Sequence, residues 1–188
     1  MYPTLYLHGF LSTPVSNKAR LLKKAHEERG IPFIAPELYM SPFEVAALIR
    51  KIRQEHGELN VIGSSLGGLY ASWAMENLKL NRAVLLNPAL GNWGPVGLES
   101  GWFDIEGTDK KMFVGEDFLD QVIEMLPSSF ADQSKYLAVL SEKDEVLDWS
   151  VSRDLLSKAA QIVLPEGDHR ISEFEPLVPP IMDFLADS

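Results

Sequence analysis

Short apolar runs alternate with segments of helical spacing along almost the whole chain. Six of these runs are three to five residues long, contain branched or aromatic side chains, and end near turn residues, as the strands of a buried sheet do. We expect these strands at residues 4–7, 31–35, 59–62, 82–86, 136–140 and 162–164.

The segments between the strands have apolar residues three or four positions apart, which is the repeat of an amphipathic helix. Ser16 and Ser41 are expected to cap the first two helices, and Gly30 and Gly57 to end them. Strands that alternate with helices predict an α/β fold of three layers, with a mainly parallel sheet of about six strands between the helices. We expect helices within residues 16–30, 41–56, 65–80, 115–126, 149–159 and 180–186.

Residues 88–135 interrupt this alternation. The segment is rich in glycine and aromatic residues over positions 91–103 and carries only one of the expected helices. A connection this long between strands is usually functional, and its aromatic content argues against disorder. We therefore expect one domain over residues 1–188, with 88–135 as a cap-like or lid-like excursion from it.

The chain is acidic and contains no cysteine. Its 188 residues, 46% of them hydrophobic and 23% charged, suffice for one domain with a sizeable core. Lysine and arginine number 17 against 27 aspartates and glutamates, and the net charge of −10 opposes binding to nucleic acid or to an anionic membrane surface. Without cysteine, disulfides, thiolate metal sites and a cysteine nucleophile are excluded.

The sequence carries no sign of export or of a membrane span. Residues 1–10 lack the basic region and the cleavage site of a signal peptide. No apolar run approaches the roughly 18 residues that a membrane-spanning helix needs. We expect a cytoplasmic protein without membrane insertion, and the sequence leaves its oligomeric state open.

A nucleophile elbow is predicted at Gly63-Ser64-Ser65-Leu66-Gly67. A strand enters this Gly-x-Ser-x-Gly motif and a helix leaves it, and the strained turn between them needs residues without a Cβ two positions before and after the serine. Only Ser65 has glycine at both places, because Ser64 is flanked at those distances by Ile and Leu. A phosphate-binding loop is excluded, since Leu69-Tyr70 stands where that loop needs Lys and Ser or Thr.

The base that would activate Ser65 is expected to be His169. A serine hydroxyl needs a base to take its proton. After an elbow serine, the acid comes next along the chain and the histidine follows it. His169 comes just after the last strand, at the edge of the sheet where catalytic groups of α/β proteins gather. His26 and His56 are expected to be solvated on polar helix faces, and His8 precedes the serine.

The acid is expected in the loop that follows strand 136–140. Asp144 lies close behind that strand and just before an apolar pair, so it is the favoured residue. Glu142, Glu145 and Asp148 are rivals in the same loop, although Asp148 is better explained as the N-cap of the next helix. Asp168 adjoins the histidine in sequence, which makes a bond between the two side chains awkward.

Two backbone N–H groups are expected to stabilise the oxyanion of the transition state. One belongs to Leu66, the residue after the nucleophile, and the other to the loop after the first strand. In that loop Gly9 lets the chain turn close to the serine, and the N–H of Phe10 is the candidate. On this interpretation His8 is a structural residue of the loop.

These residues, taken together, resemble the α/β-hydrolase superfamily and, within it, the small YqiA-type bacterial esterases. The matching stretches cover nearly the whole chain in the family's order: Tyr6-Leu7-His8-Gly9-Phe10, Ser12-Thr13-Pro14 with Lys18-Ala19, Gly63-Ser64-Ser65-Leu66-Gly67-Gly68, Asn87-Pro88-Ala89, Asp144-Glu145-Val146-Leu147-Asp148 and Gly167-Asp168-His169-Arg170.

The resemblance implies a hydrolase sheet that lacks the first two of the usual eight strands. It implies Ser65, Asp144 and His169 as a catalytic triad, with esterase or thioesterase activity on short acyl chains. Residues 91–112 do not match the family's pattern. Because we expect this segment to roof the pocket, the resemblance leaves the substrate preference open.

We predict from the sequence a serine hydrolase that cleaves small carboxylic esters or thioesters through an acyl-enzyme, without a metal or an organic cofactor. Two alternatives stay open. The same triad could serve acyl transfer or the hydrolysis of a carbon–carbon bond, or the chain could be a non-catalytic binding protein on a hydrolase scaffold. Ser65 disfavours haloalkane and epoxide hydrolases, whose nucleophile is an aspartate.

Overall fold

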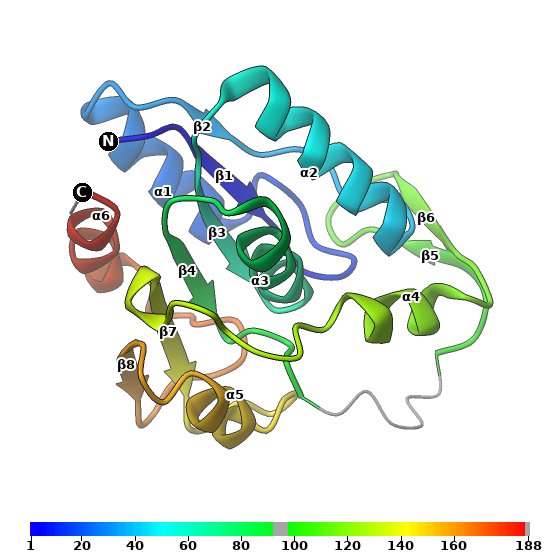
Figure 1. Ribbon diagram of the computed structural model, residues 1–188. Helices are drawn as coiled ribbons and strands as arrows, with labels where there is room; N and C mark the ends of the chain where they lie inside the picture. Colours follow the sequence, from blue (N-terminus) through cyan, green and yellow to red (C-terminus); the bar gives the residue numbers. More distant parts are fainter. Residues whose placement is uncertain (92–97, 187–188) are drawn as a thin grey trace.

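Six parallel strands form the central sheet of the structure, a computed structural model that describes residues 1–91 and 98–186 (Figure 1). Their spatial order is β2-β1-β3-β4-β7-β8, and every neighbouring pair is parallel. This confirms the predicted fold class. The strands are β1 (Thr4–Leu7), β2 (Phe33–Ile34), β3 (Asn60–Ser64), β4 (Ala83–Leu86), β7 (Tyr136–Ser141) and β8 (Ala160–Leu164).

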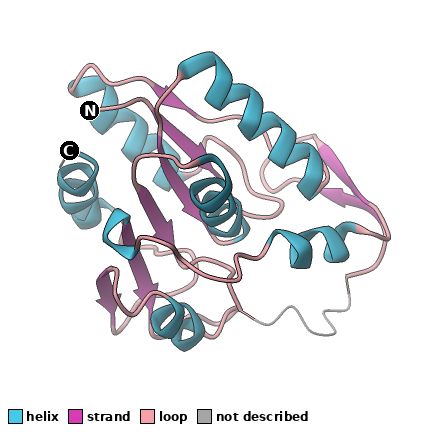
Figure 2. Cartoon of the chain, viewed as in Figure 1, coloured by secondary structure: helices cyan, strands magenta, loops and turns pink. Residues whose placement is uncertain are grey.

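Helices cover both faces of this sheet, so that the molecule has three layers (Figures 1 and 2). Helices α1 and α6 pack on one face, and α2 and α3 pack on the other. The helices are α1 (Asn17–Glu28), α2 (Pro42–His56), α3 (Leu66–Leu78), α4 (Phe118–Met125), α5 (Trp149–Leu155) and α6 (Val178–Ala186), with 3₁₀ turns η1 (Gln133–Lys135) and η2 (Glu175–Leu177).

The central strands carry apolar side chains on both faces because both faces of the sheet are covered. Successive side chains of a strand point to opposite faces. In β1, Leu5 therefore packs in the cluster under α2 and α3, while Tyr6 packs in the cluster under α1 and α6. Every residue of β1, β3, β4 and β7 is buried, which explains why the sequence shows continuous apolar runs instead of an alternation.

The predicted caps are present at the first two helices. Ser41 accepts a hydrogen bond from the N–H of Glu44, and the Glu44 carboxylate accepts one from the N–H of Ser41. This reciprocal pair satisfies two of the N–H groups that a helix start leaves without a partner. Ser16 likewise accepts from the N–H of Ala19 at the start of α1.

Residues 88–135 contain a β-hairpin that the sequence pattern did not predict. Strands β5 (Gly101–Asp104) and β6 (Lys111–Val114) pair antiparallel, apart from the main sheet. The helix expected over 115–126 is α4, which packs against α2 and α3. Part of the segment that was expected to roof the pocket, residues 92–97, lies outside the described residues, and the role of 88–135 as a cap stays a prediction.

His26 is buried, and the expectation that it is solvated was wrong. Ala19, Leu22 and His26 follow each other at spacings of three and four residues, so they share one face of α1, which packs on the sheet. The His26 Nδ1–H donates to the carbonyl of Leu22 at 2.7 Å, and Nε2 lies 2.9 Å from the hydroxyl of Thr4. Because both ring nitrogens have hydrogen-bond partners, the histidine can be buried between α1 and the sheet. His56 is exposed, as expected.

We expect the free energy of unfolding to fall as the pH drops below about 6.5, partly because of His26. Burial lowers the pKa of His26 in the folded chain, although its hydrogen bond to Leu22 opposes this. Below pH 6.5, the ordinary pKa of histidine, the unfolded chain binds more protons than the folded chain, so folding loses up to about 1.4 kcal/mol per pH unit. His8, also buried, has a pKa lowered by burial and acts in the same direction.

Urea unfolding of the parent and of His26→Gln between about pH 7.5 and pH 5 measures this effect. Glutamine does not titrate, so His26→Gln should lose less stability over this range than the parent. His56→Gln, a change at an exposed histidine, should follow the parent. An identical pH dependence in all three proteins would show that His26 is protonated equally in the folded and unfolded states.

Candidate active site

The predicted site residues lie on four loops at one edge of the sheet. Because all six strands are parallel, the loops at their carboxyl ends open on the same side. Phe10 follows β1, Ser65 follows β3, Asp144 follows β7 and His169 follows β8. The topology therefore brings together residues that are far apart in the sequence.

Ser65 stands at the tip of a tight turn between β3 and α3. Its backbone has φ 56° and ψ −118°, a strained conformation for a residue with a side chain. The two glycines of the motif are required by close backbone approaches. A Cβ at Gly63 would lie 2.1 Å from the carbonyl oxygen of Gly67, and a Cβ at Gly67 would lie 2.0 Å from that of Leu7.

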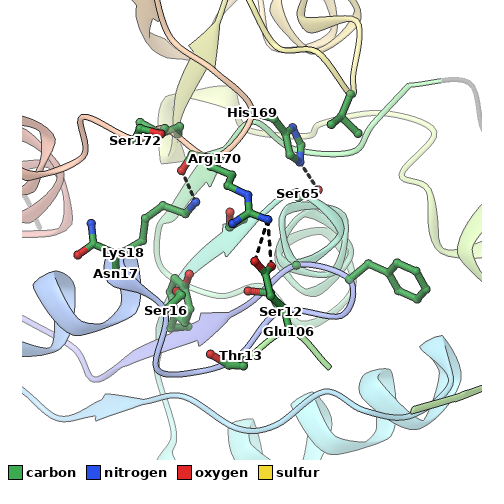
Figure 3. A pocket seen from close by; sticks show the side chains of 16 residues that line it. Ser12, Thr13, Ser16, Asn17, Lys18, Ser65, Glu106, His169, Arg170 and Ser172 are labelled. Carbon is green, nitrogen blue, oxygen red and sulfur yellow. Dashed lines mark hydrogen bonds and ion pairs between the residues drawn. The ribbon is translucent and has the colours of Figure 1, made fainter. Parts of the chain in front are cut away.

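A chain of hydrogen bonds joins Ser65, His169 and Asp144. His169 Nδ1 lies 2.8 Å from Asp144 Oδ2. His169 Nε2 lies 3.0 Å from Ser65 Oγ, a contact that Figure 3 marks with a dashed line. A carboxylate can only accept, so Nδ1 carries the proton and Nε2 accepts from the serine hydroxyl. The imidazole is thus oriented with its basic nitrogen toward Ser65.

Asp144 is held as a buried carboxylate. Its side chain is 1% exposed, and its Oδ1 accepts hydrogen bonds from the N–H groups of Val146 and Leu147, both at 2.8 Å. Burial by itself would raise the pKa of Asp144. The hydrogen bonds from His169, Leu147 and Val146 outweigh burial and hold the pKa below its ordinary value. Asp144 therefore stays charged beside the imidazole.

The other acidic residues of this region have different partners. Asp148 caps α5 by accepting a backbone N–H at 3.0 Å, as expected. Glu145 accepts the backbone N–H of His169 at 3.0 Å, and Asp168 accepts an N–H four residues further on at 2.8 Å. Glu142 is exposed. Of the acids weighed from the sequence, Asp144 is the one whose carboxylate meets the imidazole.

The backbone N–H groups of Leu66 and Phe10 are the two that the sequence assigns to the oxyanion. Leu66 is the first residue of α3, and Phe10 lies in the loop after β1 and lines the same pocket as Ser65. In the described part of the chain neither N–H has a hydrogen-bond acceptor. Gly9 brings the β1 loop close, because a Cβ built on it would be 3.3 Å from Ser65 Cβ.

His8 and the Phe10 ring hold the β1 loop in place. His8 is buried; its Nε2 accepts from the N–H of Leu38 at 3.1 Å, and its Nδ1–H donates to the carbonyl of Gly9 at 2.9 Å. The Phe10 ring packs at a tilt against Phe118 of α4, with ring centroids 5.6 Å apart. His8 thus has the structural contacts that were expected of it.

Asn87, which the sequence reasoning did not single out as functional, joins the loops of the acid and the base. It follows β4 with φ 42°. Its Nδ2 donates to the carbonyls of Asp168 and His169 at 3.1 and 3.0 Å, and its Oδ1 accepts the N–H of Ser141 at 2.8 Å. The signal for it is a polar residue directly behind a buried strand and before a proline.

A pocket of about 660 Å³ opens beside Ser65, a volume typical of small-molecule sites. Phe10, Val146 and Ile171 contribute apolar contacts to it. Much of the remaining lining consists of hydroxyl groups and two cations, and Figure 3 shows these residues around the cavity. They are Ser12, Thr13, Ser16, Lys18, Arg170 and Ser172.

Lys18, Arg170 and Glu106 form a polar cluster in this pocket that the sequence reasoning gave no role. Lys18 Nζ donates to the backbone carbonyl of Arg170 at 2.6 Å. Arg170 Nη2 lies 3.0 Å from both carboxylate oxygens of Glu106, which belongs to the turn of the β5–β6 hairpin. Lys18 and Arg170 stand in stretches that carry the family resemblance, but no local motif links three residues so far apart in the chain, so the sequence does not predict that they meet.

The site as described consists of side chains and backbone N–H groups. Within residues 1–91 and 98–186, no three histidine or acidic side chains are grouped so that they could hold a metal ion. In the same ranges, no helix has both the length and the apolar character needed to cross a bilayer.

Known proteins resemble this chain in sequence. The model of a family described as "Uncharacterised protein family (UPF0227)" matches residues 3–186. A UPF0227 protein of Serratia proteamaculans (strain 568) is 28% identical over 180 residues, which cover 92% of each chain.

Solved structures resemble it in fold. α/β-Hydrolase domain-containing protein 10 from mouse gives a TM-score of 0.69 at 16% identity, over 97% of this chain and 89% of the mouse chain. Est1E from Butyrivibrio proteoclasticus, solved with ferulic acid bound, gives 0.69 at 17% identity, over 100% of this chain and 90% of Est1E. The chain therefore belongs to the uncharacterised protein family UPF0227 and has the fold of the α/β-hydrolase superfamily.

Proposed function

We propose that this protein is a serine hydrolase that cleaves carboxylic esters or thioesters of small molecules, with Ser65 as nucleophile, His169 as base and Asp144 as the acid that orients it. The observation that carries the proposal is the hydrogen-bonded chain Ser65–His169–Asp144 beside a pocket. Est1E, similar in fold, has been solved with ferulic acid, a carboxylic acid, which is the class of product that such a reaction releases.

In the first half of the reaction Ser65 Oγ attacks the carbonyl carbon of the ester. His169 Nε2, 3.0 Å from Oγ, accepts the hydroxyl proton as the new bond forms. The imidazolium then gives that proton to the oxygen or sulfur of the leaving group, whose bond to the acyl carbon breaks. The product of this half is an acyl-enzyme on Ser65.

In the second half a water molecule replaces the leaving group. His169 takes a proton from the water, which attacks the acyl carbon, and returns it to Ser65 Oγ as the acid departs. Asp144, charged and buried, fixes the Nδ1–H tautomer of the imidazole in both halves and stabilises the imidazolium. Every step uses the chain's own groups and water, so we propose that no metal or organic cofactor takes part.

The negative charge that develops on the substrate oxygen needs donors that are already in place. We assign this role to the N–H groups of Phe10 and Leu66. Both border Ser65, and in the described residues both lack another acceptor. The close approach of Gly9 to Ser65 sets the β1 loop near enough to serve the same oxygen.

The excursion 88–135 is proposed to act as a cap over this site. Glu106, from the turn of its hairpin, lines the pocket and pairs with Arg170 on the loop of His169. The N–H of Glu106 also donates to the carbonyl of Leu11, on the loop after β1. The cytoplasmic location that the sequence suggests remains a prediction.

The proposed function is tested by reaction with a fluorophosphonate probe, which traps an activated serine. We expect the intact mass of the parent protein to increase by one probe adduct, and Ser65→Ala to gain none. The adduct should map to Ser65 after proteolysis. A parent protein that stays unmodified, or an adduct that persists in Ser65→Ala, would contradict the proposed function.

A further inference from the structure

The pocket beside Ser65 has a polar end with two cations. Lys18, near the start of α1, and Arg170, directly after His169, both contribute to its lining. Hydroxyl groups of Ser12, Thr13, Ser16 and Ser172 stand around them (Figure 3). A surface of this kind binds oxygen-bearing, negatively charged groups better than hydrocarbon.

The ammonium of Lys18 is only partly compensated. Burial lowers its pKa to about 8, although the charge of Asp168 opposes this. Nζ donates to the carbonyl of Arg170, and in the described part of the chain no carboxylate lies within ion-pair distance of it. Asp168 accepts hydrogen bonds from Ser172 instead. A desolvated cation with one neutral acceptor gains from an anion that enters the pocket.

Arg170 offers a second cation at the rim. Its side chain is 71% exposed, and its Nη2 contacts both oxygens of Glu106. Nε and Nη1 of Arg170 therefore have no acceptor within the described residues. In Figure 3 the guanidinium lies between Lys18 and Ser65. Because an exposed ion pair is weak, an incoming carboxylate can compete with Glu106 for this group.

A long hydrocarbon chain fits this end of the pocket poorly. Such a chain would have to lie along the hydroxyl groups and would remove water from Lys18 without replacing its hydrogen bonds. Phe10, Val146 and Ile171 supply apolar lining, which we assign to the segment between the reacting carbonyl and a polar end group.

We propose that the pocket selects esters or thioesters that carry, besides the reacting carbonyl, an ionised carboxylate. Lys18 binds this carboxylate inside the pocket and Arg170 binds it at the rim. This inference rests on the proposed function, because it names the substrate class of the same site. The carboxylate belongs either to the acyl arm or to the leaving group, and the two are separated by the choice of test substrate.

Two pairs of test substrates place a carboxylate or its neutral amide at matched positions. The acyl pair is mono-4-nitrophenyl adipate and the corresponding 4-nitrophenyl adipamate. The leaving-group pair is 4-carboxyphenyl hexanoate and 4-carbamoylphenyl hexanoate. In at least one pair we expect kcat/KM to be roughly ten- to a hundredfold higher for the carboxylate, the size of one or two charge-assisted hydrogen bonds.

Lys18→Met should reduce that carboxylate-to-amide ratio of kcat/KM to near one, and Lys18→Arg, which keeps the charge, should retain part of it. Lys18→Met could also loosen the loop of His169, but this would lower kcat/KM for the carboxylate and for the amide alike and would leave their ratio unchanged. Lys24→Met removes the same charge from the same helix at a side chain that is 76% exposed, and its ratio should equal that of the parent.

The results separate this inference from the proposed function. If fluorophosphonate labels Ser65 and the enzyme hydrolyses both members of each pair equally well, the carboxylate inference is overturned and the hydrolase stands. The same holds if a preference exists but survives in Lys18→Met. If the probe does not label Ser65 and neither pair is hydrolysed, the proposed function fails and the inference falls with it.

Discussion

Replacing Ser65 by alanine should lower kcat for ester hydrolysis by roughly four to six orders of magnitude, and His169→Ala should cost about as much. The two side chains act as one unit. Without the hydroxyl there is no nucleophile for the imidazole to activate. Without the imidazole, the hydroxyl proton loses the acceptor that it has within the described residues. The double variant should therefore be little slower than either single variant.

The kcat of all three variants is measured by steady-state hydrolysis of 4-nitrophenyl butyrate. Circular dichroism verifies that each variant is folded. Ser64→Ala is the matched control, because it removes a hydroxyl from the preceding residue, which makes no hydrogen bond to the imidazole within the described residues; we expect it to cost less than tenfold. If the losses of Ser65→Ala and His169→Ala multiplied in the double variant, the two residues would not share one mechanism.

Asp144→Asn should lower kcat by roughly three to four orders of magnitude while leaving the chain folded. An amide at this position can donate to Nδ1, which favours the imidazole tautomer with its proton on Nε2. That tautomer cannot accept the proton of Ser65. The loss of the negative charge also removes the partner that stabilises the imidazolium.

Asp148→Asn provides the comparison within the same loop. Asp148 caps α5, and asparagine is also a good N-cap, so we expect this variant to lose less than tenfold in kcat. Glu145→Gln tests the acid that binds the backbone of His169. Its loss in kcat should lie between the losses of Asp148→Asn and Asp144→Asn. A loss in Asp148→Asn that matched the loss in Asp144→Asn would mean that the acid has been misassigned.

The main sheet was predictable because its strands are buried on both faces. Burial makes each strand a continuous apolar run, which stands out between helical segments. The β5–β6 hairpin was not predictable on the same grounds. Trp102 and Phe113 pair across it with 68% and 50% of their surfaces exposed. Large aromatic residues on the open face hide the alternation that usually marks a half-buried strand.

The candidate site was predictable as far as local rules reach. The elbow motif selects Ser65, and the order of partners along the chain selects His169. The acid was harder, because several carboxylates lie in one loop. The sequence favours Asp144 and explains Asp148 as an N-cap, and the structure shows that the carboxylate of Asp144 meets the imidazole. Lys18 and Arg170 meet across 152 positions of sequence, a contact that no spacing rule contains. The catalytic roles themselves stay predictions until the variants are measured.

The contacts of Asn87 bear on how such a site can diversify. Its amide holds the loops of Asp144 and His169 mainly through backbone atoms, the N–H of Ser141 and the carbonyls of Asp168 and His169, and it also donates to the hydroxyl of Ser141. Every amino acid at positions 168 and 169 supplies the same carbonyl, and every amino acid except proline supplies the N–H at position 141. Side chains near these contacts of Asn87, such as that of Arg170, can therefore be exchanged without moving the loops. For directed evolution, libraries at position 170 should alter substrate choice, whereas position 87 should tolerate almost no replacement.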